Sequence, residues 1–306
     1  MVEADLSFPL VPRWRPVGSA FGRLRAARRG IGSSVATTRS YIPGDDPGLI
    51  DWKLSARLSS IRGTAEFVVR EDFADEAPRA VVVADHAPSM GLYPDDLPWL
   101  SKPAALRSVW QAVASASAQE LGLAGYLDTA AGQSWFAPRP RARFGEVDAR
   151  EREAPFDADR DGLEAAFDHL SRSRRSLPAG TFVFVCSDFL TPPGATTWLH
   201  ALGVRWDPVP VVVQDPVWEQ SFPPVDGLVV PFADPATGRI RQVRISAKEA
   251  RRLRELNETR LAALLAEFRS LGLDYVVVGD SDPGAVVRAF IDWAEARIAY
   301  RRGAWR

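Results

Sequence analysis

The sequence predicts an α/β protein with a mostly parallel sheet and flanking helices. Apolar runs rich in β-branched residues, typical of strands buried on both faces, recur at 79–85, 181–187 and 209–213. Stretches with the apolar period of a helix separate these runs, and strands that alternate with helices favour a parallel sheet. The 306 residues are 46% hydrophobic and 25% charged, which is typical of a globular protein with a sizeable core.

The individual elements follow in chain order. Residues 1–62 are rich in Pro, Gly, Arg and Ser without a sustained period, so we expect loops and at most short helices there. Alternation over 64–71 predicts an edge strand. The next elements that we expect are strand 79–85, helix 103–121, hairpin strands 123–128 and 133–137, helix 162–172, strand 181–187, helix 196–202 and strand 209–213.

The alternation of strands and helices is then interrupted. Residues 222–245 indicate an inserted β-hairpin, followed by a long helix that opens with Ser246 and Glu249 at capping-box spacing. A strand at 274–278 and a last helix complete the chain. We therefore expect an N-terminal basic extension over 1–77, which includes the motif-rich segment 41–57 described below, and an α/β domain over 78–306 with the hairpin insertion at about 217–246.

Composition and charge limit the partners and the cellular location that we expect for the chain. The net charge of −1 provides no overall field that would attract nucleic acid. Residues 6–44 carry seven arginines and no acidic residue, so this basic arm either lies on the acidic body or contacts an anionic surface or partner. Cys186 is the single cysteine, which favours the cytoplasm, and no apolar run is long enough to predict a transmembrane segment.

Two acidic residues mark a candidate ligand site. Asp85 and Asp188 each end a strongly apolar strand, and open parallel sheets bind ligands beyond the carboxyl ends of their strands. Carboxylate oxygens from two strand ends, together with nearby hydroxyl groups, suit Mg²⁺. The alternative is that each aspartate caps the segment that follows it.

Several short motifs resemble the signature of a bacterial family known as domain of unknown function 58, DUF58. They are Tyr-Ile-Pro-Gly-Asp-Asp at 41–46, Ile-Asp-Trp-Lys at 50–53 and Ala-Arg at 56–57. The family's Asp-x-Ser-x-Ser-Met loop is matched by 85–90, and its Asp-Pro-x-Thr-Gly hairpin by 234–238. The resemblance spans about residues 20–300.

This resemblance implies a von Willebrand factor A-like (Rossmann-like) fold with a metal-ion-dependent adhesion site, and a non-enzymatic role in protein interaction. A MoxR-type AAA+ ATPase is the implied partner, and Mg²⁺ the implied ion. Ala87 stands where the family has its middle serine, so either water replaces that ligand or the site has lost its metal. The implied metal ligands are Asp85, Ser89, Asp188 and, in place of the family's loop threonine, Asp161.

The signature segment has two interpretations. Its opposite charges and its tryptophan could dock the N-terminal segment on the sheet, or they could form a surface for a partner. The candidate partner-binding residues are Tyr41, Asp45, Asp46, Asp51, Trp52 and Arg57.

Two rival functions stay open at this point. One is a metal-free scaffold. The other is a metal-dependent phosphohydrolase with Asp85 as nucleophile and Asp188 as metal ligand, which is less favoured because Ala87 stands where such an enzyme needs a second, acidic aspartate.

Overall fold

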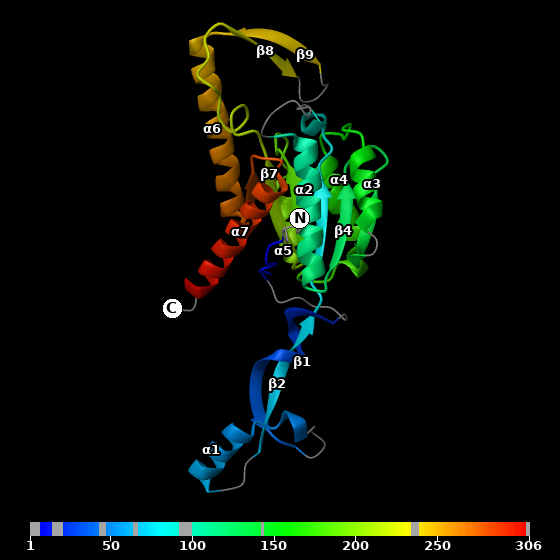
Figure 1. Cartoon of the computed structure of the whole chain (residues 1–306), viewed down its shortest axis with the longest axis vertical. Coiled ribbons are helices and arrows are strands. Elements are labelled where there is room, and N and C mark those ends of the chain that lie inside the picture. The colour runs from blue at the N-terminus through cyan, green and yellow to red at the C-terminus, as the bar shows by residue number, and fades with distance from the viewer. Residues whose placement is uncertain are drawn as a thin grey trace, which may run out of the picture.

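The structure is a computed structural model that describes residues 7–13, 21–42, 47–63, 67–91, 100–141, 144–233 and 239–303. Its centre is a six-stranded sheet with the order β10-β7-β6-β3-β4-β5 (Figure 1). Only the β4–β5 pair is antiparallel, which confirms the predicted mostly parallel sheet. The strands are β3 (Arg79–Ala84), β4 (Leu123–Asp128), β5 (Trp135–Arg139), β6 (Phe182–Ser187), β7 (Asp207–Val213) and β10 (Val276–Val278).

Helices cover both faces of this sheet. Because successive side chains of a strand point to opposite faces, Val82 belongs to one apolar cluster and its neighbours Val81 and Val83 to the other. One face packs on α2 (Lys102–Gln119), α3 (Phe144–Glu153) and α7 (Pro283–Gly303). The opposite face packs on α4 (Gly162–Arg172), α5 (Ala195–Gly203) and α6 (Ala247–Ser270).

The order of the strands places the candidate site. β3 is the first strand of the sheet in sequence and lies in its middle, with β4 on one side and β6 on the other. The order therefore reverses between β3 and β6, the position at which open α/β sheets bind ligands. Asp85 follows β3 and Asp188 follows β6, so both lie at this reversal.

The N-terminal region departs from the expectation of loops. β1 (Phe21–Ser40) and β2 (Val68–Glu76) form a two-stranded antiparallel arm that projects from the body, with α1 (Trp52–Arg62) at its far end (Figure 1). The expected edge strand is β2, which pairs with β1 instead of the main sheet. A ribbon held by backbone hydrogen bonds needs no buried face, so a period-two apolar pattern is not required of its sequence.

The first described residues belong to the core of the α/β body. Phe8, Leu10 and Val11 are buried against it, and the ring of Phe8 stacks on Phe290 of α7 with centroids 4.5 Å apart. Residues 7–13 therefore pack with the sheet and its helices.

The inserted β-hairpin is confirmed. β8 (Leu228–Ala233) and β9 (Ile240–Ile245) pair antiparallel at the end of the molecule opposite the arm (Figure 1). Its turn, residues 234–238, lies outside the described residues. The predicted capping box of Ser246 and Glu249 opens α6. Among the described residues, no helix combines the length and hydrophobicity required to span a membrane.

Candidate functional site

A cavity of about 410 Å³ lies at the carboxyl edge of the sheet, where the strand order reverses. Asp85, Ser89 and Asp188 all line it, so three of the four candidate metal ligands share one cavity. Ala87 lines it as well and contributes no side-chain oxygen.

Asp161, the fourth candidate, lies apart from these three. It is the exposed N-cap residue of α4 and lines a smaller neighbouring cavity of about 150 Å³. Ala158, Asp159 and Arg160, which directly precede it, line the main cavity. The acidic residue that the fold brings to the main cavity is therefore Asp159, two residues before the expected ligand Asp161.

Asp85 is buried, and both of its carboxylate oxygens accept hydrogen bonds. Oδ1 accepts from the backbone N–H of Ala87 at 2.9 Å and from the hydroxyl of Thr129 at 3.3 Å, and Oδ2 accepts from the hydroxyl of Ser187 at 2.6 Å. Burial raises the pKa of Asp85, and the charge of Asp188 adds to this, against the lowering effect of the Ser187 bond. The Ala87 bond shows that Asp85 also caps its own loop.

Asp188 is paired with a lysine that the sequence did not indicate as a site residue. Lys102, the first residue of α2, is wholly buried, and its Nζ donates to Oδ2 of Asp188 at 2.9 Å. The same Nζ donates to Oε1 of Glu219 at 2.5 Å and to the backbone oxygen of Ser89 at 3.2 Å. The other Asp188 oxygen accepts from the N–H of Leu190 at 3.0 Å.

In this group one ammonium faces two carboxylates. Burial alone would lower the pKa of Lys102, but the carboxylates of Asp188 and Glu219 outweigh it and raise that pKa above its ordinary value. Glu219 is held in place because its Oε2 accepts from the backbone N–H of Asp215 at 2.8 Å. The site therefore contains a cation of its own.

These residues, as arranged, do not fit a divalent ion. A metal ion between Asp85 and Asp188 would lie close to the buried ammonium of Lys102, which already binds Asp188. Within the part of the chain that the structure describes, no group of three or more His, Cys, Asp or Glu side chains is placed to hold a metal ion.

A second buried polar group lies behind Asp85. The hydroxyl of Tyr126 donates to Glu151, and Nε2 of His86 lies 3.6 Å from the same Glu151 oxygen. Both ring nitrogens of His86 lack a hydrogen-bond partner. Because the backbone N–H of His86 donates to Thr129 at 2.8 Å, this group and the Asp85 loop are joined through one threonine.

Sequence reasoning missed Lys102, Glu219, Thr129 and Ser187. One signal for Lys102 was present: a cation in the first turn of a helix is electrostatically unfavourable, so a lysine between the N-cap Ser101 and Pro103 needs a compensating anion. Glu219 had no such signal, because its pairing with Lys102 spans 117 residues.

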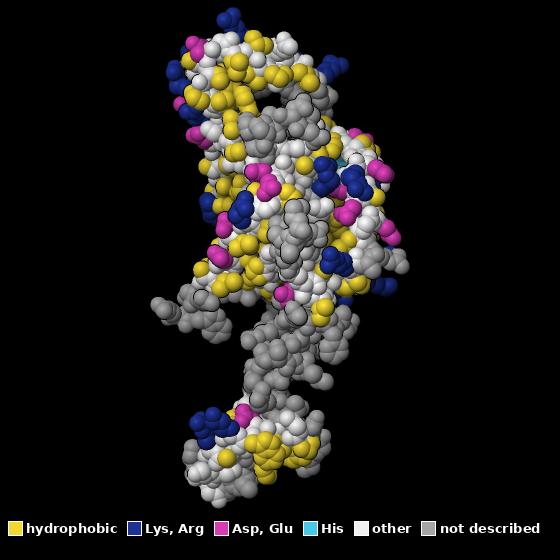
Figure 2. Space-filling model, viewed as in Figure 1, with side chains coloured by type: hydrophobic (Ala, Val, Ile, Leu, Met, Phe, Trp, Pro, Cys, Tyr) yellow, Lys and Arg dark blue, Asp and Glu magenta, His cyan; other side chains and the backbone are white. Residues whose placement is uncertain are grey.

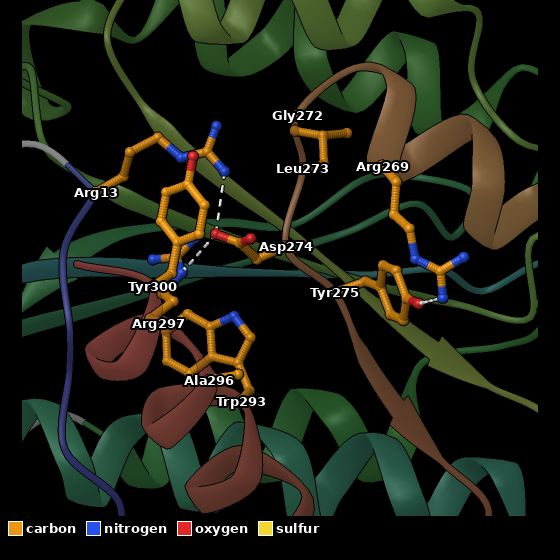
Figure 3. A pocket seen from close by; sticks show the side chains of 10 residues that line it. All are labelled: Arg13, Arg269, Gly272, Leu273, Asp274, Tyr275, Trp293, Ala296, Arg297 and Tyr300. Atoms are coloured by element: carbon orange, nitrogen blue, oxygen red, sulfur yellow. Dashed lines mark hydrogen bonds and ion pairs between the residues drawn. The ribbon is translucent and has the colours of Figure 1, made fainter. Parts of the chain in front are cut away.

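A larger cavity, of about 760 Å³, lies at the amino edge of the sheet, between the ends of α6 and α7 (Figure 3). Its charged groups mostly pair with one another. Arg297 binds both oxygens of buried Asp207, at 2.7 and 2.8 Å, and Asp274 at 2.9 Å, while Arg13 binds Asp274 at 3.1 Å. This network fastens residues 7–13 and α7 to the sheet. Of the seven arginines in the basic segment 6–44, Arg13 thus lies on acidic groups of the body, as one of the two interpretations of that segment expects.

The architecture defines the class of protein: a Rossmann-like α/β domain with a mostly parallel sheet, consistent with a von Willebrand A-like fold. The family model described as "Protein of unknown function DUF58" matches residues 37–261, so the chain belongs to this family. No curated protein matches the chain.

Two solved structures show a weak likeness to this chain. One is the conserved hypothetical protein BatB from Bacteroides thetaiotaomicron, with 13% identity over 71% of this chain and 99% of that one, at a TM-score of 0.41. The other is an aerotolerance-related membrane protein from Bacteroides fragilis, with 10% identity over 72% and 99%, at a TM-score of 0.42. At these values the likeness carries no argument about function.

Proposed function

We propose that this DUF58 protein is a non-enzymatic protein-interaction module that binds its partner through the end of the β1–β2 arm. The observation that carries the proposal is an exposed apolar surface there, which we name the arm-tip patch and define as Tyr41, Ile42, Trp52 and Phe67 (Figure 2). Ile42, Trp52 and Phe67 are 58%, 63% and 46% exposed. Neighbouring exposed apolar side chains of this size are typical of interaction sites.

The arm-tip patch is held in shape before any partner binds. The ring of Phe67 meets Trp52 edge-on at 5.9 Å and Tyr41 at 6.5 Å, and the N–H of Tyr41 donates to the backbone oxygen of Phe67 at 2.8 Å. Buried Ser55 ties α1 to β2 by accepting from the N–H of Val68 at 2.9 Å. Such a surface loses little side-chain freedom on binding, which favours affinity.

The predicted partner-binding residues divide among different roles. Tyr41 and Trp52 belong to the arm-tip patch, and Arg57 is exposed on α1. Asp51 instead caps α1, because its Oδ1 accepts from the N–H of Leu54 at 3.0 Å. Asp45 and Asp46 lie outside the described residues.

The chemistry at the carboxyl edge supports a role without catalysis. Both oxygens of Asp85 are held by hydrogen bonds from its own loop and from Ser187, which suits a residue that orders this loop. Ala87 supplies no general acid. These observations favour a metal-free interaction protein over the phosphohydrolase.

For the partner we propose a MoxR-type AAA+ ATPase in the cytoplasm, as the family resemblance implies. The exposed cations Lys53 and Arg57 beside the patch suit an acidic rim around an apolar pocket on that partner. Trp52 would be the anchor of the contact, because tryptophan is enriched among residues that dominate binding energy.

The test is the affinity of the purified chain for a MoxR-type ATPase from the same organism, measured by titration calorimetry. Trp52→Ser combined with Phe67→Ser should weaken binding at least about 30-fold, as loss of an interface hot spot does. The matched control is Leu199→Ser on α5, which removes a side chain that is 53% exposed but lies on the α/β body. Equal affinity of the patch variant, or no binding by the unmodified chain, would contradict the proposal.

A further inference from the structure

We infer that the ammonium group of Lys102 supplies the positive charge of the carboxyl-edge site, the cavity lined by Asp85, Ser89 and Asp188. The folded site therefore needs no metal ion. We further infer that the oxygens around Lys102 form a latent divalent-cation site that opens when this side chain is removed. Neither statement rests on the arm-tip patch or on the identity of its partner.

The first support is the set of atoms around Nζ. An ammonium has three N–H donors, and here it reaches three oxygens: a carboxylate oxygen of Asp188, a carboxylate oxygen of Glu219 and the backbone oxygen of Ser89. All three distances, 2.5 to 3.2 Å, are those of hydrogen bonds that a cation donates. Carboxylates and a carbonyl are also the ligands that Mg²⁺ and Mn²⁺ prefer.

The second support is where these oxygens come from. Ser89 lies in the loop after β3, Asp188 follows β6, and Glu219 lies in the loop after β7, so Lys102 joins the ends of three adjacent parallel strands. A metal ion at this edge of the sheet would perform the same joining. Lys102 reaches them from the first turn of α2, which Ser101 caps.

The third support is charge. Asp188 and Glu219 are both almost completely buried, and two neighbouring buried carboxylates stay ionised together only with a compensating cation beside them. Lys102 is that cation, and its own side chain is wholly buried. A divalent ion added beside it would bring like charges together in a region of low dielectric.

Ala87 gives independent support for the same arrangement. Ala87 lines the cavity between Asp85 and Ser89, and its methyl group offers no ligand to a metal ion. The chain thus combines a cavity-lining residue that offers no ligand with a positive charge of its own, and both features favour an edge that holds no metal ion.

The experiment compares the unmodified chain with Lys102→Ala and Lys102→Met, using Mn²⁺ as the probe. Thermal unfolding is recorded in EDTA, in Mg²⁺ and in Mn²⁺, and bound Mn²⁺ is counted by electron paramagnetic resonance. We expect the unmodified chain to bind no Mn²⁺ specifically and to unfold at the same temperature in all three conditions.

The two variants separate charge from space. Lys102→Ala leaves two carboxylates and an open volume, so we expect it to bind one Mn²⁺ per chain and to unfold several degrees higher with metal than in EDTA. Lys102→Met removes the charge but fills the volume, so we expect a much weaker metal response. Adding Asp188→Asn to Lys102→Ala should abolish the response.

Two results would overturn the inference. One is a specific Mn²⁺ ion on the unmodified chain that Asp188→Asn removes, because Lys102 would then not replace the metal. The other is a folded Lys102→Ala variant that binds no Mn²⁺, because the latent site would then not exist. If neither variant folds in EDTA, refolding of Lys102→Ala in Mn²⁺ but not in EDTA supports the inference, and failure in both overturns the latent site.

Discussion

Nζ of Lys102 lies 2.9 Å from Oδ2 of Asp188, and both side chains are almost wholly buried. The pair connects the start of α2 to the end of β6 at the point where the strand order reverses. A site that the family resemblance assigns to a metal ion thus carries a covalently attached cation, and we expect the stability of this edge to depend on it.

Replacing Lys102 by methionine should destabilise the folded chain by about 3–5 kcal/mol, because Asp188 and Glu219 lose their buried counter-ion. Urea unfolding measures this loss. Adding Asp188→Asn and Glu219→Gln to Lys102→Met should recover part of it, since the buried negative charge is then removed. A Lys102→Met variant as stable as the unmodified chain would show that the ion pair does not support the edge.

Tyr126 should resist ionisation in the folded chain. Burial and the neighbouring Glu151 raise its pKa well above 10.0. Because the folded-state pKa lies above the unfolded-state value, the stabilisation is fully present below about pH 10 and is lost as the pH rises through the folded-state pKa. Absorbance of tyrosinate at pH 10.5 should therefore be the same for the unmodified chain and Tyr126→Phe when folded, and should differ in urea by about three-quarters of one tyrosinate, because an unfolded tyrosine has a pKa of about 10. A difference of one tyrosine in the folded state would contradict this.

The thiol of Cys186 should be unreactive in the folded protein. It is completely buried within β6, and burial raises its pKa well above 9.0, so almost no thiolate exists at neutral pH. Ellman's reagent should label no cysteine in the folded chain and one in denaturant. Rapid labelling of the folded chain would show that β6 opens readily.

Arg297→Ala should destabilise the body by about 3–5 kcal/mol, because it leaves buried Asp207 without the guanidinium that binds both of its oxygens. The same substitution removes the bond from Arg297 to the backbone oxygen of Val11, at 2.9 Å. We therefore expect faster amide hydrogen exchange over residues 8–11 than in Arg288→Ala, a substitution of another arginine of α7. Unchanged exchange there would show that Arg297 does not hold this segment.

Local sequence patterns predicted the strands and helices whose side chains are buried in the core. β3, β6 and β7 are buried on both faces, so their sequences must be continuous apolar runs, and Asp85 and Asp188 are conspicuous where those runs stop. α3 was missed because only Val147 and Glu151 of its ten residues are buried, which leaves almost no apolar period. β1 was missed because a two-stranded ribbon outside the core imposes no pattern of this kind.

The candidate site shows the same division between local and long-range information. The convergence of Asp85 and Asp188 follows from parallel strands whose carboxyl ends share one edge. The partners of these acids, Ser187 for Asp85 and Lys102 for Asp188, are 102 and 86 residues distant in sequence, and no local pattern specifies such pairings.

The most direct measurement of the central claim is an anomalous difference map from a crystal of the unmodified chain grown with Mn²⁺ and recorded at the manganese absorption edge. The account predicts no peak in the cavity lined by Asp85, Ser89 and Asp188, with density for the Lys102 side chain continuous to its contact with Asp188. An anomalous peak bound by Asp85 and Asp188, with Lys102 turned away, would contradict it.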